Sequence, residues 1–229
     1  MRHNKQDRDM TTLTTPPLAT LLTQLFEDAE ASSALLEQTR TTVSAEELTR
    51  LMTSTTDYRA MYARMKDFHL AVSRETATLL YMLARASKAC SIVEFGTSFG
   101  ISTLHLAAAL RDNGGGRLIS TEFETSKIAR AQANIAVAGL ADLVEIRAGD
   151  ALETLATDLP DHIDLVLLDG AKSLYPKVIA LLEPQLRQGA LIVADNADWC
   201  PEYLSRVRAV GGPYLSVPFA NDVELSIKV

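Results

Sequence analysis

Two short segments of the chain end in oxygen-bearing side chains that could hold a metal ion. Asp169 follows the apolar run 164–168, and Asp195 with Asn196 follows the run 190–194. If both runs are neighbouring parallel strands, their carboxyl ends meet at one edge of a sheet, where ligands bind in such folds. Two carboxylates and an amide, completed by water or substrate, suit Mg²⁺ or a similar divalent cation. The four histidines and two cysteines show no spacing typical of a metal site.

A glycine turn follows the apolar run 91–95. Residues 94–102 read E-F-G-T-S-F-G-I-S, with Gly96 placed to allow a tight turn and Gly100 a close approach. The turn lacks the middle glycine of the G-x-G-x-x-G motif found in dinucleotide-binding proteins. Glu94 directly before the turn would oppose a pyrophosphate, so the turn favours a ligand with a cationic group.

Two further acids are expected at the same edge of the sheet. Glu122 ends the apolar run 117–121, where an acid can accept hydrogen bonds from ribose hydroxyls. Asp150 follows the run 143–147, and it could accept from an exocyclic amine or cap the next helix. Together with Glu94, these acids suit a ligand that carries an ammonium, a ribose and an adenine.

An alternation of apolar runs and helical patterns positions these residues. The helical patterns lie near 101–111, 125–138, 151–158 and 173–187. Strands that alternate with helices predict an α/β fold with a parallel sheet and right-handed crossovers. The segments 214–219 and 223–229 flank a turn-forming tripeptide and predict an antiparallel pair at one edge of the sheet.

The first 69 residues have a different pattern. Residues 1–16 are polar and rich in threonine, and we expect them to be disordered. Residues 17–69 form a predicted helical extension, with apolar stripes that include Leu18, Leu22 and Met61. These stripes could pack against the main domain or against a second subunit.

Composition limits the class of protein. The chain has 229 residues, enough for one large α/β domain, and its 22 Lys and Arg against 29 Asp and Glu give a net charge of −7. This balance argues against a general nucleic-acid binder. Two isolated cysteines form no disulfide framework. Because neither a signal peptide nor a membrane-spanning run is visible, we expect a cytoplasmic protein with no membrane contact.

The motifs resemble a known family. The turn at 94–102 and the acid Glu122 are similar to the first motifs of class I S-adenosylmethionine-dependent methyltransferases. The sequence D-G-A-K-S-L-Y at 169–175 and the Asp195-Asn196 pair resemble the cation-dependent O-methyltransferases, which include catechol and caffeoyl-CoA O-methyltransferases. The resemblance covers residues 70–229. It implies a Rossmann-like methyltransferase domain with a seven-stranded, mostly parallel sheet, a C-terminal antiparallel hairpin and added N-terminal helices.

The resemblance also implies the roles of individual residues. Asp169, Asp195 and Asn196 would hold Mg²⁺ or another divalent cation, and Lys172 would be the base. Leu70 and Trp199 would line the pocket of a small catechol-like aromatic acceptor. The contacts to S-adenosylmethionine, which becomes S-adenosylhomocysteine, would come from Val72, Glu94, Gly96, Ser98, Ser102, Glu122, Asp150, Ala151 and Asp169. Members of this family are commonly homodimers, so we expect a homodimer here.

Physical chemistry sets one condition on this mechanism. A phenol with a pKa of about 10 is a poor nucleophile until it loses its proton. Lys172 could take that proton only if metal charge and burial depress its own pKa.

Two other functions remain open from the sequence. The same chemistry could act on a hydroxylated uridine of transfer RNA, as in some bacterial relatives of this group. A local basic face for that substrate would come from Arg59, Arg64, Lys66, Arg74 and Arg85. Alternatively, the chain could bind the cofactor without turnover, with its N-terminal helices mediating assembly.

Overall fold

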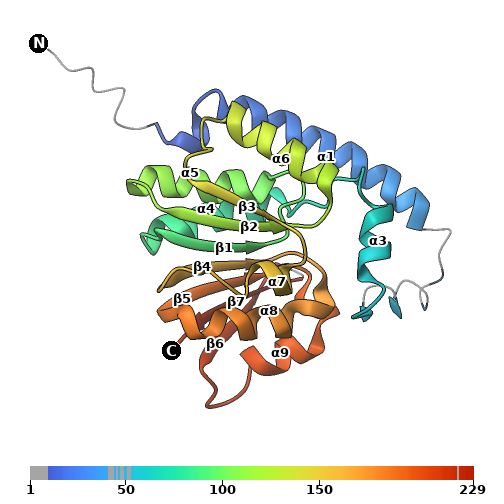
Figure 1. The fold of residues 1–229 in the computed structure, drawn as a ribbon, viewed down its shortest axis with the longest axis vertical. Coiled ribbons are helices and arrows are strands. Elements are labelled where there is room, and N and C mark those ends of the chain that lie inside the picture. The colour runs from blue at the N-terminus through green and yellow to red at the C-terminus, as the bar shows by residue number, and fades with distance from the viewer. Residues whose placement is uncertain (1–9, 41–43, 45, 47–48, 51–52, 221) are drawn as a thin grey trace, which may run out of the picture.

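A seven-stranded sheet forms the centre of the computed structural model (Figure 1). The structure describes residues 10–229 apart from 41–43, 45, 47–48, 51–52 and 221. The strands are β1 (Ser91–Phe95), β2 (Arg117–Glu122), β3 (Val144–Ala148), β4 (Ile163–Leu168), β5 (Leu186–Ala194), β6 (Tyr214–Phe219) and β7 (Val223–Lys228). Their order is β3-β2-β1-β4-β5-β7-β6. Strands β1 to β5 pair in parallel and β7 is antiparallel to both β5 and β6, which confirms the predicted fold class.

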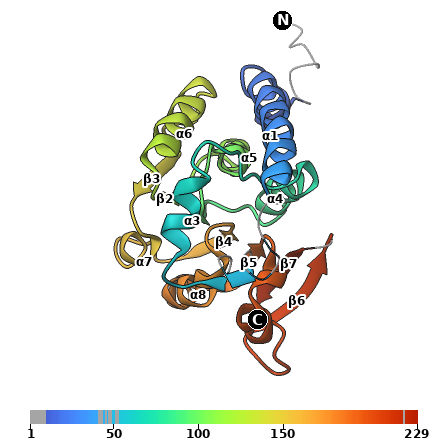
Figure 2. The ribbon, with the colours of Figure 1, turned by 90° about the vertical axis from the view of Figure 1, so that its right-hand side faces the viewer.

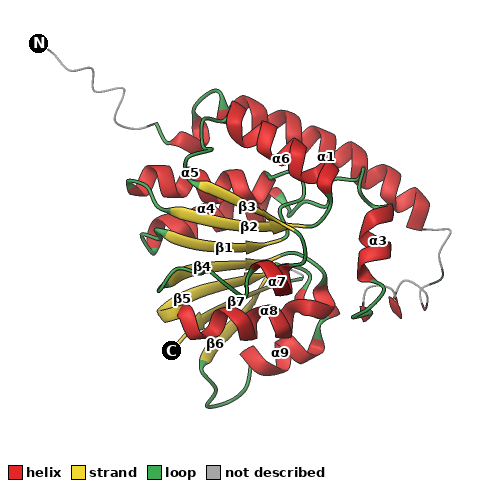
Figure 3. Ribbon diagram, viewed as in Figure 1, coloured by secondary structure: helices red, strands yellow, loops and turns green. Residues whose placement is uncertain are grey.

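Helices cover both faces of the sheet (Figure 3). They are α1 (Leu18–Arg40), α3 (Tyr58–Arg64), α4 (Arg74–Ala86), α5 (Ile101–Asn113), α6 (Thr125–Val137), α7 (Ala151–Thr154), α8 (Tyr175–Leu182) and α9 (Pro201–Val207). Short 3-10 helices lie at Thr12–Thr14, Lys172–Leu174, Glu183–Gln185 and Ala197–Trp199. The pattern near 173–187 is therefore divided, and β5 begins at Leu186, earlier than expected. Helix α9 was not predicted.

The alternation of side chains along each strand separates two cores. Ile92 and Leu165 face a core that includes α1, α4, α5 and α6. Val93 and Val166, one residue further on, face a core that includes α7, α8 and α9. Figure 2, which looks at the sheet from the side of α3, shows α1, α4, α5 and α6 on one side and α7 and α8 on the other.

The strand register aligns the ends of the central strands. Phe95 of β1 lies opposite Thr121 of β2 and Leu168 of β4, and Leu168 lies opposite Ala194 of β5. The residues that come next therefore lie side by side at the carboxyl edge. They are Gly96, Glu122, Asp169 and Asp195.

The N-terminal segment packs against the rest of the chain. Helix α1 contributes Leu18, Leu22 and Phe26 to the core that it shares with α4 and α5. These three side chains are buried within the chain, so they offer no surface to a second copy. The 3-10 helix at Thr12–Thr14 replaces the disorder expected there, because the backbone N–H of Thr12 donates to Asp112 at 3.1 Å. Residues 1–9 of the expected tail lie outside the described residues. No helix in the described part of the chain is long and apolar enough to span a membrane.

Candidate active site

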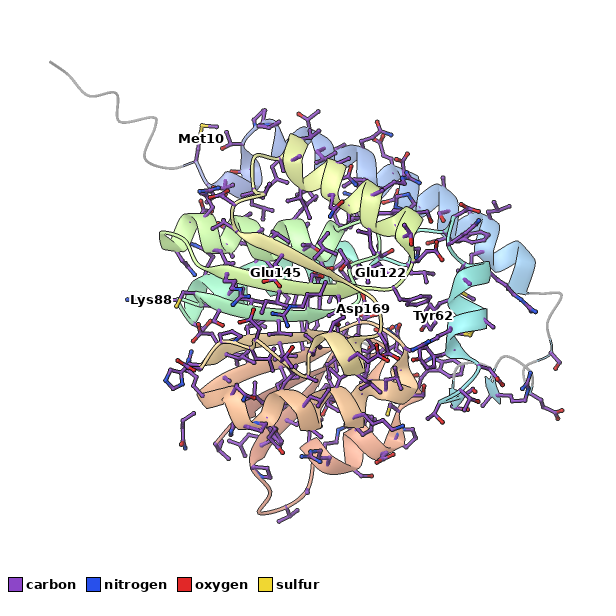
Figure 4. All side chains as sticks on the ribbon, viewed as in Figure 1. Met10, Tyr62, Lys88, Glu122, Glu145 and Asp169 are labelled. Carbon is purple, nitrogen blue, oxygen red and sulfur yellow. The ribbon has the colours of Figure 1, made fainter. Side chains whose placement is uncertain are left out.

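Three cavities adjoin at the carboxyl edge of the sheet. The turn cavity is lined by residues that include Gly96, Ser98, Glu122, Asp150 and Asp169. The aspartate cavity is lined by residues that include Asp169, Lys172, Asp195, Asn196 and Trp199. The small inner cavity is lined by residues that include His69, Leu70, Gly96, Ser98 and Ser102. Asp169 and Tyr62 lie in the walls of both larger cavities, and Figure 4 shows them beside Glu122 at this edge.

The glycine turn brings the backbone of β1 close to that of β4. Gly96 has a φ of +107°, and an added Cβ would lie 2.6 Å from the carbonyl oxygen of Asp169. Only glycine combines that backbone conformation with so close an approach. Ser98 has a φ of +48°, which is uncommon for a residue with a side chain and recurs at functional turns. The local conformation thus shapes the wall of the turn cavity.

Glu122 is held by backbone donors. Its carboxylate accepts from the N–H groups of Ser98 at 2.9 Å and of Phe123 and Glu124 at 3.0 Å. These bonds fix the carboxylate at the end of β2, where it lines the turn cavity, and its contact with a ribose stays a prediction.

Asp150 takes one of the two roles that its sequence position allowed, the helix cap, and its contact with a ligand amine stays a prediction. It caps α7 by accepting from the N–H of Leu152 at 2.9 Å, and it lines the turn cavity. Tyr58 of α3 also donates to it at 3.0 Å, and the Arg59 guanidinium forms an ion pair with it. Although burial favours the protonated form, these hydrogen bonds lower the pKa of Asp150. Helix α3 is thereby tied to the rim of the turn cavity.

Glu94 lies behind the turn cavity and does not line it. Its side chain is fully buried and accepts from the hydroxyls of Ser102 at 2.5 Å and of Thr103 and Ser120 at 2.6 Å. Burial raises the pKa of Glu94 to about 7, although the three hydroxyls oppose this shift. In this structure Glu94 ties α5 and β2 to the end of β1. Contact between Glu94 and a cofactor stays a prediction.

The other expected cofactor contacts are distributed unevenly. Ala151 lines the turn cavity, and Ser102 lines the inner cavity. Val72 is buried in the core that contains α1 and α5, and it lines none of the three cavities. Its neighbour Leu70 lines all three.

The aspartate cavity holds a buried cation between two carboxylates. The ammonium of Lys172, which is 4% exposed, lies 2.8 Å from Oδ1 of Asp169 and 3.9 Å from Oδ2 of Asp195. Burial alone would lower the pKa of Lys172, but these carboxylates outweigh it and hold the pKa well above the usual value. Lys172 is therefore a protonated partner of the aspartates in this arrangement.

The donor set fits a hard divalent cation. Burial and the charge of Asp169 raise the pKa of Asp195 to about 8, which reflects two crowded carboxylates. Asn196, in the left-handed conformation that asparagine tolerates, donates through Nδ2 to Asp222 at 2.8 Å and keeps its own carbonyl oxygen for a ligand. Within the described residues, no group of three or more His, Cys, Asp or Glu side chains is arranged for a metal, so a cation held at Asp169 and Asp195 would need the amide oxygen of Asn196 as its third protein donor.

Tyr175 connects the two strands that carry these ligands. Its fully buried hydroxyl lies 2.8 Å from the carbonyl oxygens of both Leu168 and Asp195. The tyrosine at the end of the D-G-A-K-S-L-Y segment thus fixes the spacing between the ends of β4 and β5.

Sequence reasoning missed several residues of the cavity walls. Tyr58 and Tyr62 belong to an apolar stripe that reads as packing, yet both line the turn cavity. His69 and Lys127 belong to no motif, so no sequence signal marks them as residues of a cavity wall. The walls of the aspartate cavity also contain Met65 beside Leu70 and Trp199, which makes that part of the cavity apolar.

The basic residues considered for a nucleic-acid face are largely engaged elsewhere. Arg59 pairs with Asp150, Arg74 pairs with Glu30 at 2.8 Å, and Arg85 donates to Asn113 at 2.7 Å. These contacts hold the three guanidinium groups against the chain's own side chains.

Comparison with known proteins identifies relatives of this chain. A family model described as O-methyltransferase matches residues 40–207. A protein of Niastella koreensis named catechol O-methyltransferase is 37% identical over 130 residues, which are 56% of this chain and 58% of the relative. A protein of the same name from Mycobacterium tuberculosis is 36% identical over 127 residues, 56% of this chain and 57% of the relative. The matched region thus spans little more than half the length of either relative.

A solved structure is similar over a larger share of the chain. The O-methyltransferase TomG of Streptomyces achromogenes, in complex with S-adenosylmethionine, superposes with a TM-score of 0.61 at 28% identity. The superposition covers 72% of this chain and 85% of TomG. Because the family match extends over most of the sequence and the sheet agrees with that of the solved relative, this chain belongs to the O-methyltransferase family.

Proposed function

We propose that this protein transfers a methyl group from S-adenosylmethionine to one hydroxyl of a catechol-like aromatic acceptor, with the help of a divalent cation. One observation carries the proposal, namely that Asp169 lies in the walls of both the turn cavity and the aspartate cavity. A donor bound in the first cavity and an acceptor bound in the second would meet at this residue. Holding two reactants in contact can lower the barrier by about 7 to 11 kcal/mol.

The turn cavity suits the cofactor because its acids match the cofactor's polar groups. Glu122 would accept from the ribose hydroxyls, and Asp150 would accept from the adenine amine. Asp169 offers a carboxylate to the cationic part of the ligand. The solved relative TomG was crystallised with S-adenosylmethionine, which supports the same cofactor here.

The aspartate cavity suits an aromatic diol and a cation. Asp169, Asp195 and Asn196 would hold the divalent cation, and the apolar side chains of Leu70 and Trp199 would contact the aromatic ring. A bound divalent cation would supply Lewis-acid stabilisation of the acceptor's oxyanion. The names of the two curated relatives, both catechol O-methyltransferase, favour a vicinal diol as the acceptor.

Lys172 would hold the proton that leaves the acceptor. Its ammonium is paired with Asp169 and Asp195, and these carboxylates keep it protonated. Lys172 becomes a base only when a bound cation neutralises the two aspartates in its place. Burial then lowers its pKa, as expected for a lysine that loses its ion-pair partners.

The proposed acceptor and base can be tested in one assay. Purified protein is given labelled S-adenosylmethionine with catechol, with phenol as the single-hydroxyl control, and with bulk transfer RNA. We expect transfer to catechol alone, and a loss of about 100-fold or more in kcat for Lys172→Met. Lys177→Met, an exposed lysine of α8, is the matched control and should keep full activity. Equal rates for Lys172→Met and the wild type, or transfer to RNA alone, would contradict the proposal.

A homodimer is a separate proposal. The stripe of α1 that suggested it is buried within the chain, so any dimer must use another surface. Light scattering after size-exclusion chromatography gives the mass directly. A mass of one chain at the concentration of the activity assay would exclude a dimer as the active form.

A further inference from the structure

Lys127 is a buried lysine in the wall of the turn cavity, and the carboxylates of the described residues around it lie beyond ion-pair distance. It lies in the first turns of α6, and only 4% of its surface is exposed. Its ammonium is 3.4 Å from the hydroxyl oxygen of Ser98 and 5.4 Å from the centre of the Phe99 ring. Among the described residues, none forms an ion pair with it within 4.0 Å, whereas the buried Lys172 has two such partners.

The ammonium of Lys127 has little compensation from the side chains that the structure describes. A buried charge is stable only when it is paired or well hydrogen-bonded, and one long bond to a neutral hydroxyl compensates little. Burial lowers the pKa of Lys127, and the charges of Glu122 and Asp169 offset this only in part. A bound anion beside the ammonium would supply the missing compensation.

The surroundings of Lys127 differ from the rest of the turn cavity. Elsewhere the cavity wall carries acceptors, at Glu122, Asp150 and Asp169. Lys127 lines the same cavity beside Ser98, and Ser98 also lines the inner cavity. The side chains at this end of the site can therefore donate to an anionic group of a ligand that extends from one cavity into the other.

His69 supplies a second, independent sign of a ligand at this end. Its ring packs on Phe99 with 4.2 Å between the ring centres, and it lines the inner cavity. The residue is 7% exposed, and its Nδ1 has no hydrogen-bond partner in the described part of the chain. Burial and the charges of Arg130 and Lys127 lower the pKa of His69, so the neutral ring can donate from Nδ1 in one tautomer.

We propose that Lys127 binds the carboxylate of the amino-acid part of the cofactor, with Nδ1 of His69 as a second donor from the inner cavity. This inference rests on the proposed function, because the cofactor is the ligand whose only anionic group is that carboxylate. Lys127 thereby orients the amino-acid end of the cofactor, while the acids of the turn cavity receive its ribose, adenine and cationic groups.

The test compares two ligands that differ only in the carboxylate. S-adenosylhomocysteine and its decarboxylated analogue are titrated calorimetrically into the wild type and into Lys127→Met. We expect Lys127→Met to bind S-adenosylhomocysteine about 10- to 100-fold more weakly, the range for a lost hydrogen bond to a charged group, and to bind the analogue almost as the wild type does. Arg130→Met is the matched control, because Arg130 packs on the same Phe99 ring but is exposed and outside the cavity walls.

The outcomes separate this inference from the proposed function. Wild type that binds neither ligand would refute the proposed cofactor and the inference with it. Wild type that binds both ligands equally would overturn the inference alone, and this comparison does not depend on the folding of any variant. Equal weakening of both ligands in Lys127→Met would assign Lys127 a purely structural role and would also overturn the inference. Lys127→Gln repeats the comparison with a polar side chain.

Discussion

Glu94 should make the stability of the protein fall as the pH rises towards neutrality. Its carboxyl group is fully buried, and burial raises its pKa from 4.5 to about 7. Between these values the folded state binds a proton that the unfolded state has already lost. The folded state is therefore favoured at the acidic end of this window, and the advantage disappears as the pH rises through the folded-state pKa.

The magnitude follows from the size of the shift. Each pKa unit corresponds to about 1.4 kcal/mol, so the full shift of Glu94 amounts to about 3 kcal/mol. Between about pH 5 and about pH 8, the free energy of unfolding should fall by about 2 to 3 kcal/mol because of this residue. Glu94→Gln keeps the shape of the side chain and one acceptor oxygen but cannot ionise, so its contribution should not depend on pH.

Urea unfolding at a series of pH values measures this difference. The fall between about pH 5 and about pH 8 should be smaller in Glu94→Gln than in the wild type by about 2 to 3 kcal/mol. Glu224→Gln is the matched control, because Glu224 is also buried but hydrogen bonds from Arg208 and Ser216 lower its pKa. The stabilising effect of ionised Glu224 is lost only below about pH 5. Glu224→Gln should therefore leave the fall in the free energy of unfolding between about pH 5 and about pH 8 unchanged. The same pH dependence in Glu94→Gln and the wild type would refute the reasoning.

Three further substitutions test other contacts. Tyr175→Phe removes the hydroxyl between the ends of β4 and β5, and urea unfolding should show a loss of about 1 to 3 kcal/mol; an unchanged free energy would contradict the role. Arg59→Ala removes one of the two α3 side chains that contact Asp150, so hydrogen exchange should accelerate in α3 but not in the central strands; unchanged exchange in α3 would contradict this role. Gly96→Ala forces a Cβ against Asp169, and binding of S-adenosylhomocysteine should weaken by about tenfold or more; normal binding would contradict the close approach.

Much of the fold could be predicted because its signals are local. The apolar runs marked the central strands to within a few residues, and Asp150 caps α7 by accepting from the N–H of Leu152 at 2.9 Å. The sequence-based predictions were wrong where contacts between distant residues determine the local structure. The polar segment at Thr12–Thr14 is ordered by Asp112, which lies 100 residues further along the chain. The end of α8 and the early start of β5 had no periodic signal.

The candidate site was predictable only where a motif sets the residue at a strand end. Asp169, Lys172, Asp195 and Asn196 come together because strand register places neighbouring carboxyl ends side by side. Tyr62 and Lys127 reach the cavities from helices, and neither helix carries a spacing that distinguishes a cavity wall from ordinary packing. The burial of Glu94 could not be foreseen, because three hydroxyls from different elements surround it only in the folded chain.

The rate of methyl transfer to catechol with and without a divalent cation tests the central claim most directly. The purified protein is assayed with S-adenosylmethionine and catechol in Mg²⁺, then in excess chelator, then with Mg²⁺ restored. The arrangement of Asp169, Asp195 and Asn196 predicts turnover in Mg²⁺, a loss of about 100-fold or more in chelator and full recovery afterwards. A rate that chelation leaves unchanged would contradict the account.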